Sequence, residues 1–488
     1  MDMSTPTLVT FIVYLIGMLV IGLIAYRLTD NLSDYVLGGR RLGGGVAALS
    51  AGASDMSGWL LLGLPGALYA AGMNQIWIAV GLSIGAYLNW QFVARRLRVY
   101  TEVAQDSITV PDYLENRFHD RSKLLRVISA LVILLFFTFY TSAGMVGGAI
   151  LFEQSFGLDY TVALWVGAAV IISYTFLGGF LAVCWTDFFQ GLLMFLALVI
   201  TPIAVISADG GWAQAVSNVG AIDPTRLDVF HEMTVLGIIS LMAWGLGYFG
   251  QPHIIVRFMA VKSSGEIPTA RLVGMTWMVL SLYGAIFTGF AGIAYFADQP
   301  LENPETVFIT LTQVLFNPWV AGVLLAAILS AIMSTIDSQL LVSSSALTED
   351  FYKPFLRKQA SQHELVWVGR IAVAVIALIA ILIAYNPQSR VLDLVAYAWG
   401  GFGAAFGPVI ILSLFWRRMT RNGALAGMIL GALTVVIWKQ LSGGIFDVYE
   451  IVPGFILCTL AIVVVSLLDK EPGRETQVDF DAVEMTLK

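Results

Sequence analysis

The 488-residue sequence is poor in charge and in cysteine. Charged residues make up 12% of the chain, hydrophobic residues make up 58%, and the mean hydropathy is +0.82. Because soluble domains carry about 25% charged residues, this composition excludes a soluble globular protein and indicates a polytopic membrane protein. The two cysteines, Cys184 and Cys458, fall at or inside apolar stretches, which argues against a structural disulfide and against a cysteine metal site.

The sequence also lacks a signal peptide and a strong basic patch. The first apolar run, Leu8 to Tyr26, has no preceding Lys or Arg and no small-residue cleavage site, so we expect a retained membrane span. The net charge of −7 belongs to loops and tail and argues against nucleic-acid binding. Nothing in the sequence indicates an obligate protein partner, whereas membrane lipid must surround the apolar stretches.

Thirteen apolar stretches are long enough to be membrane helices, each needing about 20 residues. Only short connections and a tail remain, so no soluble catalytic domain fits and we expect no enzyme. The predicted spans are 7–26, 44–71, 75–94, 124–152, 159–180, 183–207, 232–256, 272–297, 318–346, 366–386, 391–416, 422–440 and 449–468.

The loop charges predict an orientation for these spans. With the N-terminus outside and the C-terminus in the cytoplasm, all but three of the 26 Lys and Arg residues are cytoplasmic, the exceptions being Arg226, Arg390 and Lys439. The positive-inside rule favours this arrangement. We further expect a short surface helix at 305–316 and a poorly ordered acidic tail after Leu468.

The second predicted span contains a carboxylate, Asp55, where apolar residues are expected. A charge at bilayer depth costs at least about 2.5 kcal/mol, so it needs a partner, a water-filled cavity or a bound ion. Gly52, Ser54, Ser57 and Gly58 around it are poor helix formers, so the backbone can open toward a ligand. These features favour a cation site, the alternative being that Asp55 caps a helix at the membrane surface.

A second glycine-rich stretch lies in the seventh span, where residues 244–252 include three glycines and a proline. Transporters often contain two inverted copies of a helical unit, each starting with an interrupted helix. Spans two to six and seven to eleven fit such a pair. The alternative is that the glycines only permit close helix packing.

The ninth span carries a hydrophilic face made by Ser330, Ser334, Asp337 and Ser338, at i, i+4, i+7 and i+8. Hydroxyls and free carbonyls are suitable oxygen ligands for Na⁺. The alternative for a single hydroxyl is a bond to its own i−4 carbonyl. Asp187, at the start of the sixth span, is predicted to be a neighbour of Asp337 and Ser338 in an accessory cation site or release path, or else to cap its own helix.

Aromatic residues indicate a substrate site. Trp244, Tyr248 and Pro252 recur at i, i+4 and i+8, and Tyr140 lies among phenylalanines in the fourth span. Such faces suit a small solute with an apolar ring and one polar end, although packing is the commoner role of aromatic stripes. No Arg or Lys is expected at bilayer depth, so an anionic head would meet backbone N–H groups or the cation.

Long sequence stretches resemble the sodium:solute symporter family, and the likeness runs from Thr5 to about Leu468. The stretches are SAGASDMSGWLLLGLPG at 50–66, YTFLGGF at 174–180, WGLGYFGQPH at 244–253, AIMSTIDSQLL at 331–341, LTEDFYK at 347–353, AYAWGGFGAAFGP at 396–408 and RMTRNGALAGM at 418–428.

The resemblance implies an all-α membrane protein of thirteen transmembrane helices, with a leucine-transporter-type 5+5 inverted-repeat core and three extra helices. The expected units are 1–43 (first helix and cytoplasmic loop), 44–207 (first five-helix repeat), 208–416 (second, inverted repeat), 417–468 (two additional helices) and 469–488 (cytoplasmic tail). It implies location in the cytoplasmic (inner) membrane.

The resemblance also implies the residues of the site. Carbonyls of Ala53, Met56 and Ala331 with hydroxyls of Ser334 and Thr335 would hold Na⁺, with Asp55 coupling that ion to the substrate. The positions associated with proline are Ser57, Gly58, Tyr140, Trp244, Tyr248 and Pro252. Arg40 matches a residue associated with coupling. Asp337 stands where a serine is expected, which leaves the number of coupled ions open.

The implied activity is import of L-proline, driven by Na⁺, by alternating access. The alternatives within this class are another amino acid, a monocarboxylate or pantothenate. The alternative outside the transporters is a sensor or a channel that uses the same fold. A sensor would need a large signalling domain, and the tail is too short for one.

Overall fold

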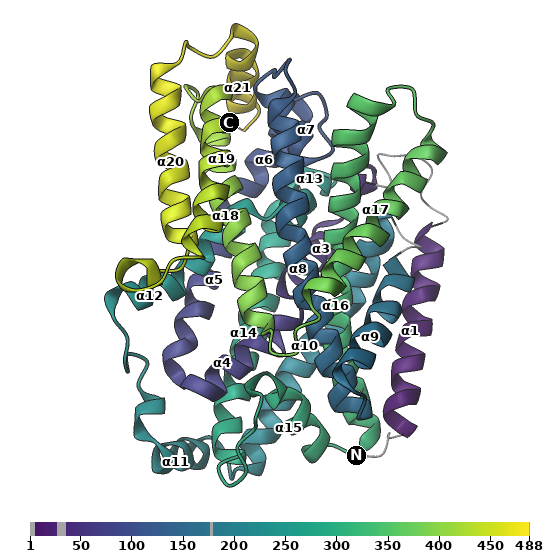
Figure 1. The fold of residues 1–488 in the computed structure, drawn as a ribbon, viewed down its shortest axis with the longest axis vertical. Coiled ribbons are helices and arrows are strands. Elements are labelled where there is room, and N and C mark those ends of the chain that lie inside the picture. Colours follow the sequence, from purple (N-terminus) through teal and green to yellow (C-terminus); the bar gives the residue numbers. More distant parts are fainter. Residues whose placement is uncertain (1–4, 27–35, 176–178, 488) are drawn as a thin grey trace.

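The computed structural model describes residues 5–26, 36–175 and 179–487, and these form an assembly of helices (Figure 1). In chain order the α-helices are α1 (Thr5–Tyr26), α3 (Gly44–Met56), α4 (Gly63–Ala71), α5 (Ile76–Leu88), α6 (Arg95–Val103), α7 (Val110–Arg117), α8 (Leu124–Phe156), α9 (Tyr160–Thr175), α10 (Phe180–Ala208) and α11 (Trp212–Ile222). They continue with α12 (Val235–Met242), α13 (Pro252–Ala260), α14 (Ile267–Tyr295), α15 (Val307–Leu315), α16 (Pro318–Ser345), α17 (Gln362–Ile383), α18 (Val391–Phe415), α19 (Arg421–Trp438), α20 (Ile451–Leu468) and α21 (Arg474–Leu487).

Within the described residues, ten helices are long and apolar enough to cross a membrane. Three shorter apolar helical stretches, Gly58–Ala71, Tyr160–Ile172 and Val235–Gly250, accompany them. These three coincide with predicted spans two, five and seven, so every predicted span has a helical counterpart, but three of them are too short to be counted by length alone. Part of the motif at 174–180 lies outside the described residues.

Both glycine-rich stretches interrupt their helices, as predicted. α3 ends where Ser57 takes a φ of +28°, a conformation that L residues rarely adopt. In the seventh span, a 3-10 segment, η6 (Ala243–Gly250), follows α12, and the chain breaks at Gln251 before Pro252 begins α13. Because of this break, Trp244 and Pro252 do not share one continuous helix face, and the predicted i, i+4, i+8 stripe is wrong for its last member.

The segment before α3 and the end of α13 are joined in the only strand-like contact of the described chain. Leu42 pairs with Val261 in an isolated parallel bridge, with Leu42 N–H donating to Ala260 O (3.2 Å) and Lys262 N–H donating to Leu42 O (2.9 Å). The segment before α3 and the end of α13 are therefore tied to each other.

Two predictions about the connections need correction. Residues 305–316 do contain a helix, α15, but its Val307, Phe308 and Leu311 are buried rather than at the surface. The acidic tail is also ordered: α21 packs against α6, with Phe480 and Val483 buried. Its carboxylates pair with Arg96, His119 and Arg417, and these basic partners are far away in sequence, which is why composition alone indicated disorder.

Candidate functional site

The opened end of α3 faces the hydroxyl groups of α16. Ser334 Oγ donates to the carbonyl oxygen of Ala53 (2.9 Å), and Thr335 Oγ1 lies 3.5 Å from that oxygen. The same two hydroxyls lie 3.2 and 3.0 Å from Ala331 O. Met56 is the last residue of α3, where carbonyls lack partners within the helix. The structure thus brings together four of the five predicted Na⁺ ligands, those of Ala53, Ala331, Ser334 and Thr335.

Asp55 connects this oxygen cluster to the aromatic residues. Its side chain is buried and accepts a hydrogen bond from Tyr248 Oη (2.5 Å), while its backbone carbonyl accepts one from Tyr140 Oη (3.1 Å). The second carboxylate oxygen, Oδ1, is buried without a hydrogen-bond partner among the described residues. An unsatisfied carboxylate oxygen at this place suits a nearby cation, and the alternative of a surface cap is excluded by the burial of Asp55.

The aromatic site is larger than predicted. The Trp244 ring lies between Trp59 (centroids 5.8 Å apart) and Trp399 (6.5 Å), with Tyr449 5.6 Å away. Trp399 Nε1 donates to Trp244 O (2.7 Å), and a Cβ at Gly247 would overlap the Trp399 ring. The motif at 396–408 contains Trp399, so the sequence held a signal for it, although nothing local indicated that α18 would reach η6.

The remaining substrate positions surround the break in α3. Ser57 and Gly58 are buried at the turn itself, and the Ser57 hydroxyl accepts from Trp59 N–H (3.4 Å). Pro252 begins α13 and lines a small cavity whose lining contains none of the aromatic residues. Tyr140 belongs to α8 and Trp244 and Tyr248 belong to η6, and the hydroxyls of Tyr140 and Tyr248 both reach Asp55.

Asp187 and Ser338 do lie together, but through an arginine that the sequence analysis placed in a loop. Arg257 Nη2 lies 3.1 Å from Asp187 Oδ2 and donates to Ser338 Oγ (2.6 Å), and Arg257 Nε donates to Ser50 Oγ (3.1 Å). The side chains of Arg257 and Asp187 are fully buried. Arg257 is therefore not the loop residue after the seventh span that was predicted, but belongs to α13 and is buried in the protein.

This cluster also decides two alternatives. Asp187 is the eighth residue of α10, which begins at Phe180, so Asp187 is not the cap of that helix. Asp337 is fully buried and interacts electrostatically with both Asp187 and Arg257. On α16, Ser330 donates to Ala326 O (2.9 Å), the ordinary i−4 bond, so only part of the hydroxyl face points to other helices.

Arg40 lies outside this centre, between the segment that precedes α3 and the end of α13. Its guanidinium pairs with Asp106 (2.8 Å) and donates to Met259 O (2.6 Å) and Ser107 O (2.9 Å). Burial lowers the pKa of Arg40 from its ordinary value, although Asp106 opposes that change. Arg40 thus connects the segment before α3 with the end of α13 and with the turn after α6, which is where a coupling residue could act on both interrupted helices.

Comparison with known proteins agrees with this geometry. The model of the sodium:solute symporter family matches residues 35–431. The sodium/proline symporter of Escherichia coli (strain K12) is 58% identical over 486 residues, covering 98% of this chain and 96% of that protein. A high-affinity proline transporter of Bacillus subtilis (strain 168) is 54% identical, covering 96% of this chain and all of that protein.

Solved structures share the fold at low identity. A Na⁺-coupled sialic acid symporter, in a substrate-bound outward-open state, superposes with a TM-score of 0.82 at 20% identity, covering 97% of this chain and 100% of the other. Mhp1, a nucleobase-cation-symport-1 family transporter, gives 0.56 at 15% identity, with 93% and 98% covered. The fold is therefore leucine-transporter-like, and it is a transporter fold rather than that of an enzyme. With this match over most of its length, the chain belongs to the sodium:solute symporter family.

Proposed function

We propose that this protein imports L-proline together with Na⁺ across the cytoplasmic membrane by alternating access. The proposal is supported by the names of full-length relatives at 50–59% identity, which are proline transporters from several bacteria. It is supported independently by the oxygens that converge between α3 and α16 and by the aromatic cluster beside Asp55.

The single observation that carries the proposal is the contact of Ser334 and Thr335 with Ala53 O. Na⁺ prefers five or six hard oxygen ligands, and neutral hydroxyl and carbonyl oxygens bind it without holding it too tightly. When Na⁺ binds, these hydroxyls turn their lone pairs to the ion, and the ion joins α3 to α16. Asp55 balances the charge and carries the effect through Tyr248 to the substrate.

The proline ring suits the aromatic faces of Trp244, Tyr248 and Tyr140, because it is apolar and compact. Its carboxylate would meet the backbone N–H groups of Ser57 and Gly58, where the helix is broken. Pro252 bounds the site toward the cytoplasm. Because Na⁺ organises this break, binding of one ligand tightens binding of the other by the same factor.

We further propose thirteen membrane spans, with two inverted five-helix repeats and three extra helices, the N-terminus outside and the C-terminus in the cytoplasm. Two observations support this arrangement. The interruptions fall in the second and seventh spans, at equivalent places of the two repeats. α1 begins at one end of the molecule and α21 lies at the other (Figure 1), as an odd number of crossings requires.

Asp187, Asp337 and Ser338 are proposed to form an accessory cation site or release path. Two carboxylates facing one guanidinium leave an excess negative charge that a second cation could balance.

The membrane potential also drives the proposed import. Import of one net positive charge gains about 2.3 kcal/mol per 100 mV, which is roughly a fiftyfold accumulation of the solute before the Na⁺ gradient is added.

The experiment is uptake of labelled proline into proteoliposomes with and without an inward Na⁺ gradient. We expect accumulation only with the gradient, and competition by unlabelled proline but not by other amino acids, monocarboxylates or pantothenate. Equal uphill uptake in Na⁺-free, proton-clamped buffer would contradict the coupling, and stronger competition by another solute would correct the substrate.

A further inference from the structure

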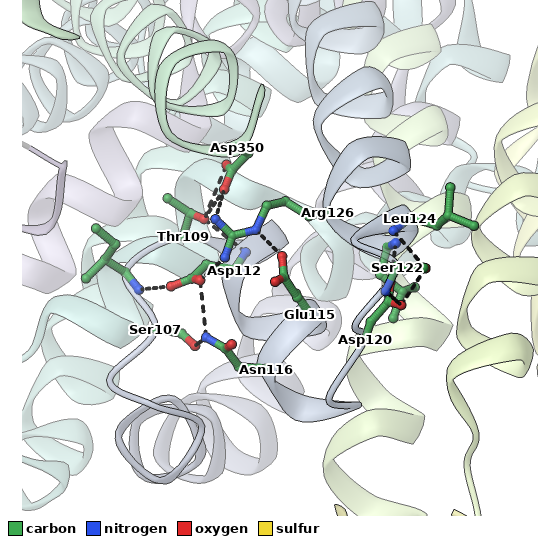
Figure 2. A network of polar contacts seen from close by, with 12 residues as sticks. Ser107, Thr109, Asp112, Glu115, Asn116, Asp120, Ser122, Leu124, Arg126 and Asp350 are labelled. Carbon is green, nitrogen blue, oxygen red and sulfur yellow. Dashed lines mark hydrogen bonds and ion pairs between the residues drawn. The ribbon is translucent and has the colours of Figure 1, made fainter. Parts of the chain in front are cut away.

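One guanidinium holds three separate elements together at the cytoplasmic end of the molecule (Figure 2). Arg126, in the first turn of α8, forms ion pairs with Asp112 and Glu115 of α7. Its Nη1 also lies 3.4 Å from Asp350 Oδ1, in the π-helical segment η9 (Ala346–Leu356) that continues α16. The Asp350 side chain is fully buried, so its charge depends on these neighbours.

Thr109 adds a second connection between α7 and η9. Its hydroxyl accepts the Asp112 N–H (3.1 Å), which caps the start of α7. The same hydroxyl lies 3.2 Å and 3.3 Å from the two carboxylate oxygens of Asp350 and donates to that group. The beginning of α7 is thus fixed to η9 both by Thr109 and by Arg126, as Figure 2 shows.

A small cavity of about 20 Å³, room for about one water molecule, lies directly against this junction. Thr109, Val110 and Pro111 at the start of α7 line one part of it, together with Asp350, and Pro252 of α13 lines another. The remaining lining residues come mainly from α16, η9 and α13 and are mostly aliphatic. The start of α13 and the start of α7 therefore line the same small space.

We propose that the Arg126 cluster is a latch that holds α7 across the cytoplasmic end of the substrate exit path, and that α7 must move away from η9 for release. The inference rests on the proposed function for the identity of the solute. Three carboxylates surround one guanidinium, so without Arg126 they repel each other. The arrangement in which α7 lies against η9 then loses its counter-charge.

The latch is placed where it can respond to Na⁺. η9 is continuous with α16, which carries Ser334 and Thr335, and Arg126 is on α8, which carries Tyr140. A shift of α16 on loss of Na⁺ would move Asp350 relative to Arg126. Arg126, Asp350 and Thr109 are thus positioning residues: none touches the substrate, and each acts by holding α7.

The test measures access to the cavity with a cysteine reporter. Ser345 lines the cavity and is buried, so Ser345→Cys should react slowly with a membrane-impermeant maleimide added from the cytoplasmic side. Cys184 and Cys458 are both buried, so labelling of the parent protein measures the background from these two cysteines. Adding Arg126→Gln should increase the labelling rate about tenfold, equivalent to about 1.4 kcal/mol, and Arg126→Lys should increase it less.

Two controls keep the test decisive. Gln359→Cys, on the exposed cytoplasmic surface, should label at the same rate with and without Arg126→Gln, which shows that the fold is intact. If Arg126→Gln fails to fold, Thr109→Val removes only one hydroxyl and should still increase labelling of Ser345→Cys. Unchanged labelling in folded Arg126→Gln or Thr109→Val protein would overturn the latch.

The labelling test can fail or succeed independently of the proposed transport of proline. Labelling is measured without Na⁺ or proline, so a different solute would leave the expected rates unchanged. In uptake assays, Thr109→Val should change the maximal rate of proline uptake while leaving half-saturation by external proline within about twofold, because the latch is remote from the substrate. A change confined to half-saturation would also contradict the latch.

Discussion

A fully buried arginine, Arg257, and a partly buried one, Arg126, each organise a polar cluster, and the clusters differ in how their charges are balanced. Arg257 and Asp187 have no exposed side-chain surface, and the cluster joins α3, α10, α13 and α16. Arg126 and its partners Asp112 and Glu115 keep 13–18% of their side chains exposed, and three carboxylates share that one guanidinium.

This difference in exposure indicates in which cluster the ion pairs can separate. At Arg257 the donors are used by a carboxylate, two hydroxyls and the His253 carbonyl, and neither Arg257 nor Asp187 has exposed side-chain surface through which water could replace them. At Arg126 water can reach the charged groups, which lowers the free-energy cost of separating them. We therefore assign a permanent role to the Arg257 cluster and a reversible one to the Arg126 cluster.

The largest expected effect is that of Arg257→Gln. It leaves Asp187 buried without a counter-charge, which should destabilise the fold by about 3–5 kcal/mol. The measurement is the yield of monodisperse protein after detergent extraction, compared with that of Arg126→Gln. The comparison between the clusters fails if the two variants give equal yields.

Asp55→Asn should abolish Na⁺-dependent proline uptake while leaving folded protein in the membrane. Asparagine has the same shape and can still accept from Tyr248, but it lacks the charge that balances Na⁺. The measurement is initial uptake rate against Na⁺ concentration. Asp112→Asn, in the cytoplasmic cluster, is the matched control and should keep its dependence on Na⁺; wild-type behaviour of Asp55→Asn would remove this residue from the site.

Trp244→Ala should raise the proline concentration for half-maximal uptake at least about tenfold, equivalent to about 1.4 kcal/mol. The Na⁺ concentration for half-maximal uptake should change much less. The ring is a wall of the aromatic cluster and touches none of the oxygens at Ala53. Uptake at varied proline and at varied Na⁺ separates the two effects. Trp367→Ala, which removes an exposed tryptophan of α17, is the control, and equal loss of both affinities would contradict the assignment.

Asp120→Asn, in the turn that leads into α8 beside the Arg126 cluster, should have the smallest effect. Burial opposes ionisation of Asp120, but hydrogen bonds from Ser122 and Leu125 N–H and the Arg421 guanidinium together lower its pKa. Its contribution to stability is therefore present above the unfolded pKa of about 3.9 and is lost as pH falls through the lower folded value.

The measurement for Asp120→Asn is the midpoint of thermal unfolding in detergent. At pH 7 we expect destabilisation of about 1 kcal/mol, because the amide weakens the hydrogen bonds that start α8. The difference from the parent should shrink as the pH is lowered below 4. Asp298→Asn, on an exposed loop, should match the parent throughout, and a pH-independent deficit for Asp120→Asn would contradict the electrostatic cause.

Much of the architecture could be predicted from local patterns. The apolar runs gave a helix for each predicted span, and the polar glycine-rich stretches located both breaks, at Ser57 and at Gln251. Ser334 and Thr335 were also placed correctly beside Ala53, through the family resemblance. Trp59 and Tyr449 were missed, because an aromatic residue in an apolar segment looks the same whether it packs or lines a site.

The sequence by itself determined where the chain is apolar and where its helices must break, because hydropathy and backbone propensity act over a few residues. Only the tertiary structure decided which charges are buried together. Arg257 looked like a loop residue until α13 placed it beside Asp187, and the acidic tail looked disordered until α6 and the turn between α18 and α19 supplied basic partners. The physical reason is that the cost of a charge depends on its neighbours in space, and these come from helices far apart in the chain.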